Sequence, residues 1–340
     1  MSVGSSSARI YLGVDGGGSK TEFVLIDESG RVLATRREGP AYYLETGVEA
    51  LKTMLTSGIH AILAQGSVSP ADLTYAFLGL PAYGEDSRLL PILDRAASPA
   101  LSQERYRCAN DMVCGWAGAL GGRDGINVVA GTGSIAYGEF AGRSARAGGW
   151  GELFSDEGSA YWIAREGLNL FSRMSDGRAE PGPLHRLIRG HFELRGDLDL
   201  CAAVYGPPPL TRSELAGLAQ IVAQAARAGD TQSLKLFHFA ATELAALVDV
   251  VRGKLNVPHG QVMPVSYSGG MFQFGDLILD PLRSALGSSA RAYEFIAPCL
   301  SPVGGAALYA AKLAGAPLTA TAIAELTRQL TTANPAVAPQ

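Results

Sequence analysis

One supersecondary pattern occurs twice in this chain of 340 residues. Residues 9–37 read as strand, glycine turn, strand, polar turn and strand, because β-branched and apolar runs are separated by glycine-rich breaks. Residues 126–151 repeat this order, again with a glycine-rich first turn. An internal repeat of this size predicts two similar lobes that face each other. The chain length also fits two domains of ordinary size.

Helices and strands alternate between the two copies of the pattern. Residues 48–65 repeat apolar positions at a spacing of three and four, as an amphipathic helix does. A strand over 73–80, a helix over 86–97, a strand over 106–110 and a helix over 112–120 are predicted to follow. This βββαβαβα order predicts that the strands after the first three run parallel in one sheet.

Helices dominate the chain after the second copy, with one more strand over 262–270. The predicted helices cover 158–174, 183–194, 212–228, 230–253, 275–286 and 303–314. The small residues of the last helix suit close packing against the sheet of the first lobe.

We therefore predict an α/β fold with two lobes. The N-terminal lobe covers 8–120 and 304–325, the C-terminal lobe covers 121–303 with helical insertions, and 326–340 is a tail. Within this tail, 331–340 is predicted to be unstructured.

Composition argues against several classes of protein. Hydrophobic residues make up 47% and charged residues 18%, which is typical of a globular chain and excludes disorder as the main state. The net charge of −4 comes without a basic stretch, so we expect no nucleic-acid partner. No uninterrupted apolar run is long enough for a membrane span, and the short polar N-terminus does not resemble a secretory signal. A cytoplasmic location is expected.

The cysteines and histidines form no metal-binding or disulfide pattern. The four cysteines occur in no C-x2-C pair, and the five histidines include no H-E-x-x-H motif. We expect reduced and mostly buried thiols at Cys108, Cys114, Cys201 and Cys299.

The first glycine turn, DGGGSKT at 15–21, has the composition of a phosphate cradle. Glycines let backbone N–H groups converge on an anion, and a lysine and hydroxyls lie next to them. The turn is neither a Walker A loop nor G-x-G-x-x-G, because Ser19 separates Gly18 from Lys20 and no helix is predicted to follow. An ordinary glycine-rich hairpin is the alternative.

The second turn, GTGS at 131–134, stands at the equivalent place in the other copy. Two such turns on related lobes could face one another across a cleft. Asp15 closes the first strand and Asp111 follows the strand over 106–110, at the sheet edge where α/β proteins place ligands. Phosphoryl transfer needs a carboxylate to accept a proton and Mg²⁺ to spread charge. The alternative is a helix cap formed by Asn110 or Asp111.

The segment GGWGELFSDEGSAYWIA at 148–164 is the most specific motif of the chain. It resembles the N-acetylglucosamine kinase and BadF/BadG/BcrA/BcrD ATPase group of the sugar kinase, Hsp70 and actin superfamily. The resemblance covers about 9–315 and is strongest to the N-acetylglucosamine kinase branch. It implies the actin-like ATPase fold, in which two ribonuclease-H-like lobes hold Mg-ATP in a cleft between them.

The resemblance also implies a role for individual residues. ATP would contact Asp15, Gly17, Gly18, Ser19, Lys20, Thr21, Thr132, Gly133, Ser134, Gly269 and Gly270. The sugar would contact Asp111, Gly149, Trp150, Gly151 and Asp156. Asp111 would be the catalytic base, and Asp15 would hold Mg²⁺ through water.

Alternatives remain for single positions. Trp150 would stack on a sugar or fill core beneath the glycine hairpin, and Asp156 would bind sugar, cap a helix beginning at 157 or 158, or do both. Lys20 would lie near phosphate or in solvent. Kinases of this branch usually carry an asparagine where this chain has Tyr42 or Tyr43. The identity of the amino sugar is therefore left open.

The resulting hypothesis is an ATP-dependent amino-sugar kinase that phosphorylates the 6-hydroxyl of N-acetylglucosamine. Glucosamine or N-acetylmuramate is the alternative substrate, and a homodimer is the expected assembly. One rival is an ATPase activator of a 2-hydroxyacyl-CoA dehydratase or benzoyl-CoA reductase system, which needs cysteines to bind an iron–sulfur cluster. Another is a sugar-sensing repressor, for which the first strand at about residue 9 leaves no room for a DNA-binding domain.

Overall fold

The computed structural model describes residues 8–18 and 20–333. The chain divides into two compact units. Unit 1 consists of Met1–Asp124 and Ala297–Gln340, and unit 2 is Gly125–Ile296. Each unit has its own sheet of five strands, as the internal repeat predicts.

The sheet of unit 1 has the order β3-β2-β1-β4-β5. Its strands are β1 (Ile10–Gly16), β2 (Thr21–Asp27), β3 (Val32–Glu38), β4 (Tyr75–Leu80) and β5 (Tyr106–Asn110). The first three pair antiparallel, whereas β1, β4 and β5 run parallel. The parallel strands are largely buried and read as apolar runs. The predicted meander and the predicted parallel strands are both confirmed.

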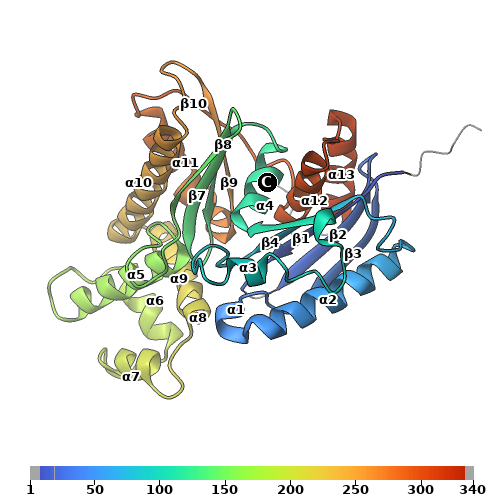
Figure 1. Cartoon of the computed structure of the whole chain (residues 1–340). Helices are drawn as coiled ribbons and strands as arrows, with labels where there is room; N and C mark the ends of the chain where they lie inside the picture. Colours follow the sequence, from blue (N-terminus) through green and yellow to red (C-terminus); the bar gives the residue numbers. More distant parts are fainter. Residues whose placement is uncertain (1–7, 19, 334–340) are drawn as a thin grey trace, which may run out of the picture. The chain divides into compact units, whose positions relative to one another are not determined.

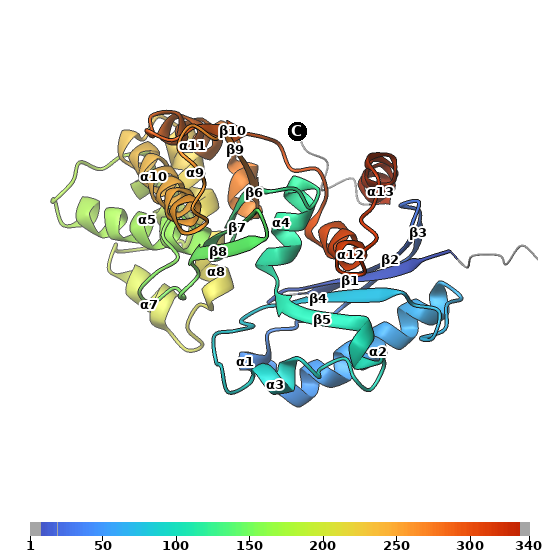
Figure 2. The ribbon, with the colours of Figure 1, turned by 45° about the horizontal axis from the view of Figure 1, so that its top comes forward.

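Helices cover both faces of this sheet (Figure 2). Leu51, Leu55 and Ile59 of α2 (Val48–Gln65) are buried in the core on one face. On the other face lie α4 (Met112–Leu120) and α12 (Pro302–Leu313). The shorter helices are α1 (Tyr43–Thr46), α3 (Leu90–Leu93) and the 3₁₀ turn η1 (Gln103–Arg105).

The predicted helix over 86–97 is wrong, because only Leu90–Leu93 is helical and turns flank it. Pro91 lies in the first turn of α3, where its missing N–H costs nothing. A helix from 86 would place this proline in its interior and remove a backbone hydrogen bond. The proline therefore limits the helix.

Helix α12 packs on β1 and α4 at very short distances, as its small residues predict. A Cβ on Gly13 would lie 2.3 Å from the backbone nitrogen of Ala307, and one on Gly305 would lie 2.2 Å from that of Gly118. Glycine is needed at these two positions because any side chain would separate the elements.

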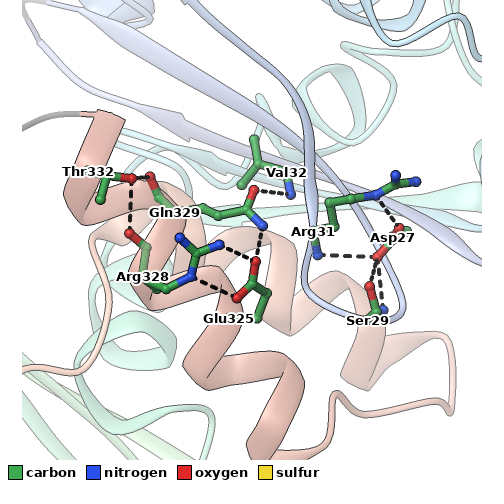
Figure 3. A network of polar contacts seen from close by, with 8 residues as sticks. All are labelled: Asp27, Ser29, Arg31, Val32, Glu325, Arg328, Gln329 and Thr332. Atoms are coloured by element: carbon green, nitrogen blue, oxygen red, sulfur yellow. Dashed lines mark hydrogen bonds and ion pairs between the residues drawn. The ribbon is translucent and has the colours of Figure 1, made fainter.

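The C-terminal helix α13 (Ala320–Ala333) was not predicted, and the prediction that 331–340 is unstructured is wrong for 331–333, which belong to this helix. Residues 334–340 lie outside the described part of the chain. Figure 3 shows α13 beside the β2–β3 hairpin, where the Gln329 side-chain oxygen accepts a hydrogen bond from Val32 N at 2.9 Å. Ala322 and Leu326 are buried. This apolar face, together with the bond to the edge strand β3, holds the helix on unit 1.

The sheet of unit 2 has the order β10-β9-β6-β7-β8, which is the connectivity of unit 1 repeated. Its strands are β6 (Gly125–Ala130), β7 (Ser134–Phe140), β8 (Arg143–Gly148), β9 (Met263–Ser268) and β10 (Tyr293–Phe295). Strands β6, β7 and β8 pair antiparallel, and β9 and β10 continue the sheet from β6 in parallel (Figure 1, with β6 labelled in Figure 2). The short β10 was not predicted.

The helices of unit 2 are inserted mostly between β8 and β9. They are α5 (Ala160–Ser175), α6 (Pro183–His191), α7 (Asp199–Tyr205), α8 (Arg212–Gly217), α9 (Ala219–Arg227), α10 (Thr231–Lys254), the 3₁₀ turn η2 (Gly270–Phe274) and α11 (Asp276–Gly287). The helix predicted over 212–228 is divided into α8 and α9, and α7 was not predicted. Within the described residues, no helix combines the length and apolarity that a membrane span requires.

Candidate functional site

Two aspartates lie at the carboxyl edge of the parallel strands in unit 1. Asp15 is near the end of β1 and pairs in register with Gly79 of β4, while Asp111 directly follows β5. Both side chains are half-buried. Burial raises the pKa of Asp111 to about 6, and the charge of Glu85 adds to the effect. A carboxyl group with this pKa can take up and release a proton near neutral pH.

The neighbouring carboxyl group is also perturbed. Burial raises the pKa of Asp15 well above its ordinary value, and the negative charges of Asp111 and Glu22 raise it further. A divalent cation next to Asp15 would relieve this unfavourable concentration of negative charge, and Mg²⁺ prefers oxygen ligands with several retained waters. Among the described residues no group of three or more His, Cys, Asp or Glu side chains is arranged to hold a metal. A cation held by one carboxylate through water fits this arrangement.

The capping alternative for Asp111 is wrong in detail. Asp111 stands at the N-cap position of α4 but makes no side-chain capping bond. The side-chain oxygen of Asn110 instead accepts a hydrogen bond from Met112 N at 3.1 Å. Of the two residues that the sequence offered as the helix cap, Asn110 thus makes the side-chain bond at the start of α4.

The first glycine turn is a closed hairpin. Gly17 N donates to Lys20 O at 2.8 Å, and the Thr21 hydroxyl donates to Gly39 O at 2.8 Å. Lys20 forms a 2.7 Å ion pair with Glu22 on the next strand. Gly18 has open space around it. The predicted phosphate contact Ser19 lies outside the described residues.

A buried thiol, which sequence reasoning did not assign to the site, lies beneath the carboxylates. The sulfur of Cys114 donates a hydrogen bond to Val14 O at 3.7 Å. A Cβ on Gly79 would lie 2.3 Å from this sulfur and 3.0 Å from the Cα of Asp111. Gly79 therefore permits α4 to bring Cys114 and Asp111 against the strand end. The other thiols are free as well, with Cys108 buried and Cys201 exposed.

In unit 2 the second glycine turn is tied to the segment before α5. Gly131 N donates to Gly133 O at 2.9 Å, which closes the turn. The Ser134 hydroxyl donates to Glu157 O at 2.6 Å, and Ser134 N donates to an Asp156 oxygen at 3.2 Å. The glycine turn predicted at 131–134 is thus confirmed, and the phosphate contacts of Thr132, Gly133 and Ser134 stay a prediction.

Asp156 does not cap the following helix, which corrects one of its two predicted roles. Helix α5 begins at Ala160, and its N-cap is Ser159, whose hydroxyl accepts from Trp162 N at 3.1 Å. Asp156 has a φ of +62°, which is uncommon for a residue with a side chain, and is almost fully buried. Its second carboxylate oxygen forms a 2.6 Å ion pair with Arg212, a partner that no local sequence pattern indicates.

The loop before Asp156 presents large apolar side chains to solvent. Trp150 is 69% exposed, so the alternative in which it fills core is wrong. Leu153 and Phe154 are exposed as well. Gly149 and Gly151 on either side of Trp150 have φ of +69° and +96°, a backbone conformation that favours glycine.

The third glycine motif follows the neighbouring parallel strand of the same sheet. Gly269, after β9, has a φ of +106°, and a Cβ there would lie 2.4 Å from the carbonyl oxygen of Ala130. Because β6 and β9 run parallel, Gly269 and Gly270 lie at the same sheet edge as the 131–134 turn. Glycine at 269 therefore lets the segment after β9 pass close to the backbone of Ala130, and a Cβ on Gly270 would meet open space.

Of the two tyrosines that replace the usual asparagine, one belongs to the core of unit 1. Tyr43 is buried, and its hydroxyl donates to Ala82 O at 2.9 Å. Tyr42 is half-buried beside the same core.

The comparisons with known proteins agree with this arrangement. The sequence profile of the BadF/BadG/BcrA/BcrD ATPase family matches residues 12–310. The chain belongs to this family. An N-acetyl-D-glucosamine kinase of Dictyostelium discoideum is 27% identical over 89% of this chain and 98% of that protein. An N-acetylmuramic acid/N-acetylglucosamine kinase of Clostridium acetobutylicum is 30% identical over 82% of this chain and 90% of its own length.

Solved structures support the same family and fold. A Chromobacterium violaceum protein provisionally named an N-acetylglucosamine kinase has a TM-score of 0.70 and 28% identity, covering 89% of this chain and 99% of that one. A hexokinase of the ROK family from Thermus thermophilus shares the fold, with a TM-score of 0.53, 16% identity and coverage of 90% and 99%. The family resemblance and the two-lobed α/β fold of sugar kinases and actin-like ATPases are confirmed.

Proposed function

We propose that this protein is an ATP-dependent amino-sugar kinase that phosphorylates the 6-hydroxyl of N-acetylglucosamine. The observation that carries the proposal is the pair of perturbed carboxyl groups, Asp15 and Asp111, at the strand edge of unit 1. The names of the relatives support an amino sugar as acceptor. Glucosamine and N-acetylmuramate remain in the proposed substrate class.

Asp111 is the proposed catalytic base. Its carboxylate accepts the proton of the sugar hydroxyl while that oxygen forms a bond to the γ-phosphorus of ATP. The bond between this phosphorus and the bridging oxygen breaks, and ADP leaves with the electron pair. The proton on Asp111 then passes to solvent. A pKa of about 6 leaves Asp111 ionised at neutral pH and basic enough to take the proton.

The remaining residues bind and orient the reactants in this proposal. Backbone N–H groups of the two glycine turns bind the ATP phosphates, and Gly269 and Gly270 accommodate the adenosine. Asp15 would hold Mg²⁺ through water, and this ion would neutralise charge on the phosphates. Trp150 and Asp156 contact the sugar, by stacking on its apolar face and by accepting hydroxyl hydrogen bonds. Excluding water from the reacting groups would strengthen these interactions.

The test is ADP release by the purified protein with a panel of sugars. N-Acetylglucosamine, glucosamine, N-acetylmuramate and glucose are compared at equal concentration, with and without Mg²⁺, and the phosphorylated carbon is identified by NMR. We expect release that depends on an amino sugar and on Mg²⁺. ADP release at the same rate with and without sugar would refute the kinase proposal and point to an ATPase instead.

A homodimer is part of the proposal, by analogy with kinases of this group. Light scattering of the purified chain at assay concentration measures its mass directly. A monomeric mass would refute the proposed homodimer without affecting the proposed reaction.

A further inference from the structure

Arg212 connects the helical insertion of unit 2 to the loop that carries the proposed sugar ligands. It is the first residue of α8, and its guanidinium forms ion pairs with two carboxylates of that loop. One pair joins Nη2 to Asp156 Oδ2 at 2.6 Å, and the other joins Nε to Glu152 Oε2 at 3.1 Å. The Nη2 contact is also a hydrogen bond, whereas Nε is buried without a hydrogen-bond partner among the described residues, so its contact with Glu152 is an ion pair alone. A lysine ammonium group could not reach the two carboxylates with separate nitrogen atoms.

The ion pair between Arg212 and Asp156 also lies directly against the second glycine turn, at 131–134. A Cβ on Gly133 would be 2.8 Å from Asp156 Oδ2 and 2.9 Å from Arg212 Nη2. The other oxygen of Asp156 accepts from Ser134 N. The carboxylate of Asp156 therefore links Arg212 on one side to the phosphate turn on the other.

Burial makes this carboxylate dependent on its cation. Asp156 is 3% exposed, and burial raises its pKa, whereas the Ser134 N–H and Arg212 lower it. Breaking a buried ion pair by removing one partner leaves an uncompensated charge, which is costly. Without Arg212 the carboxyl group would either take up a proton or turn away from its place under the turn.

We propose that Arg212 is a positioning residue for the transfer reaction, which fixes Asp156 for the sugar and, through it, the turn at 131–134 for the phosphate. This inference rests on the proposed kinase function. Arg212 acts through Asp156 and is not itself a catalytic residue. Because Arg212 belongs to α8, this inference gives the helical insertion of unit 2 a role in aligning the substrates.

The experiment compares Arg212→Gln and Arg212→Lys with the matched control Arg178→Gln. Arg178 also pairs with an aspartate of unit 2, but that pair is exposed on both sides. kcat and KM are measured separately for sugar and for ATP, and melting temperatures are recorded for all variants. We expect Arg212→Gln to lower kcat/KM for the sugar on the order of 10²-fold, since small misplacements of reacting groups have effects of this size.

Arg212→Lys should recover part of the loss, because it keeps a positive charge beside Asp156. Its kcat/KM for the sugar should remain about tenfold below wild type, because a single ammonium group cannot contact Asp156 and Glu152 with separate nitrogen atoms. Should Arg212→Gln fail to fold, the lysine variant alone decides the question. Wild-type kcat and KM in a folded Arg212 variant, or equal losses in Arg178→Gln, would overturn the assignment. A wild-type protein without sugar-dependent turnover would instead refute the proposed function.

Discussion

The two sheets have the same connectivity but differ in the chemistry of their carboxyl edges. In unit 1 this edge carries Asp15 and Asp111, both with raised pKa. In unit 2 the corresponding edge carries the 131–134 turn and Gly269, which offer backbone groups. The carboxylate near that edge, Asp156, comes from a loop and is paired with Arg212.

In the proposed kinase, this difference gives one duplicated scaffold two tasks. Carboxyl groups with raised pKa are suited to moving a proton and to attracting a cation. A turn of backbone N–H groups with its nearby carboxylate already paired is suited to holding an anion, because little negative charge opposes the phosphate. The backbone repeat sets the positions, and the side chains at the strand ends set the chemistry.

The largest effect is expected from Asp111→Asn in unit 1. Removing the proposed base should lower kcat on the order of 10²–10⁴-fold, the usual contribution of general base catalysis. The measurement is ADP release at saturating sugar and ATP. The matched change in unit 2, Asp156→Asn, should act more strongly on the KM for the sugar. If both variants lost only sugar affinity, the two carboxylates would not have different tasks.

The pH profile tests the same contrast. Because Asp111 must be ionised to accept a proton and its pKa is about 6, wild-type kcat should fall about tenfold per pH unit below that value. The residual kcat of Asp111→Asn should not show this decrease at low pH. If kcat of the variant fell with pH in the same way as that of the wild type, a group other than Asp111 would be responsible for the decrease.

Much of the fold could be predicted because it depends on local periodicity and on the repeat. The ranges of α2 and α4 follow the apolar spacing, and Asp15 and Asp111 could be placed at one edge from strand order. The start of α13 lies in the range assigned to the first lobe, but the helix and its bond to Val32 were missed, because Val32 is far away in the sequence. Arg212 was missed for the same reason, since 56 residues separate it from Asp156.

Gly269→Ala in unit 2 should cause a large loss of stability. The new Cβ would meet the carbonyl of Ala130 at 2.4 Å, and the φ of +106° disfavours any side chain. Strain and overpacking together should cost about 3 kcal/mol, measured by urea unfolding. The neighbouring Gly270→Ala has open space and should change little. Similar losses of unfolding free energy in Gly269→Ala and Gly270→Ala would show that the contact with Ala130 does not cause the loss.

Gly79→Ala in unit 1 should cost less, about 2 kcal/mol, because its nearest obstacle is the side chain of Cys114 and not backbone. Combining it with Cys114→Ala removes the sulfur, so the double variant should be more stable than the sum of the two single changes predicts. No such rescue is available for Gly269. Strict additivity in the double-mutant cycle would contradict the described contact.

The smallest effects concern the edge strands, which the two units protect differently. In unit 1 the half-buried side chain of Gln329 accepts from Val32 N of β3, whereas in unit 2 the exposed Lys254 donates to Arg146 O of β8 at 2.9 Å. Gln329→Ala should lower the free energy of unfolding by about 1 kcal/mol, the usual net value of one hydrogen bond. Lys254→Ala should cost less, because water readily replaces an exposed donor. Equal losses of unfolding free energy would mean that the Gln329 bond stabilises β3 no more than a surface lysine stabilises β8. The apolar face of α13 alone would then hold this helix in place.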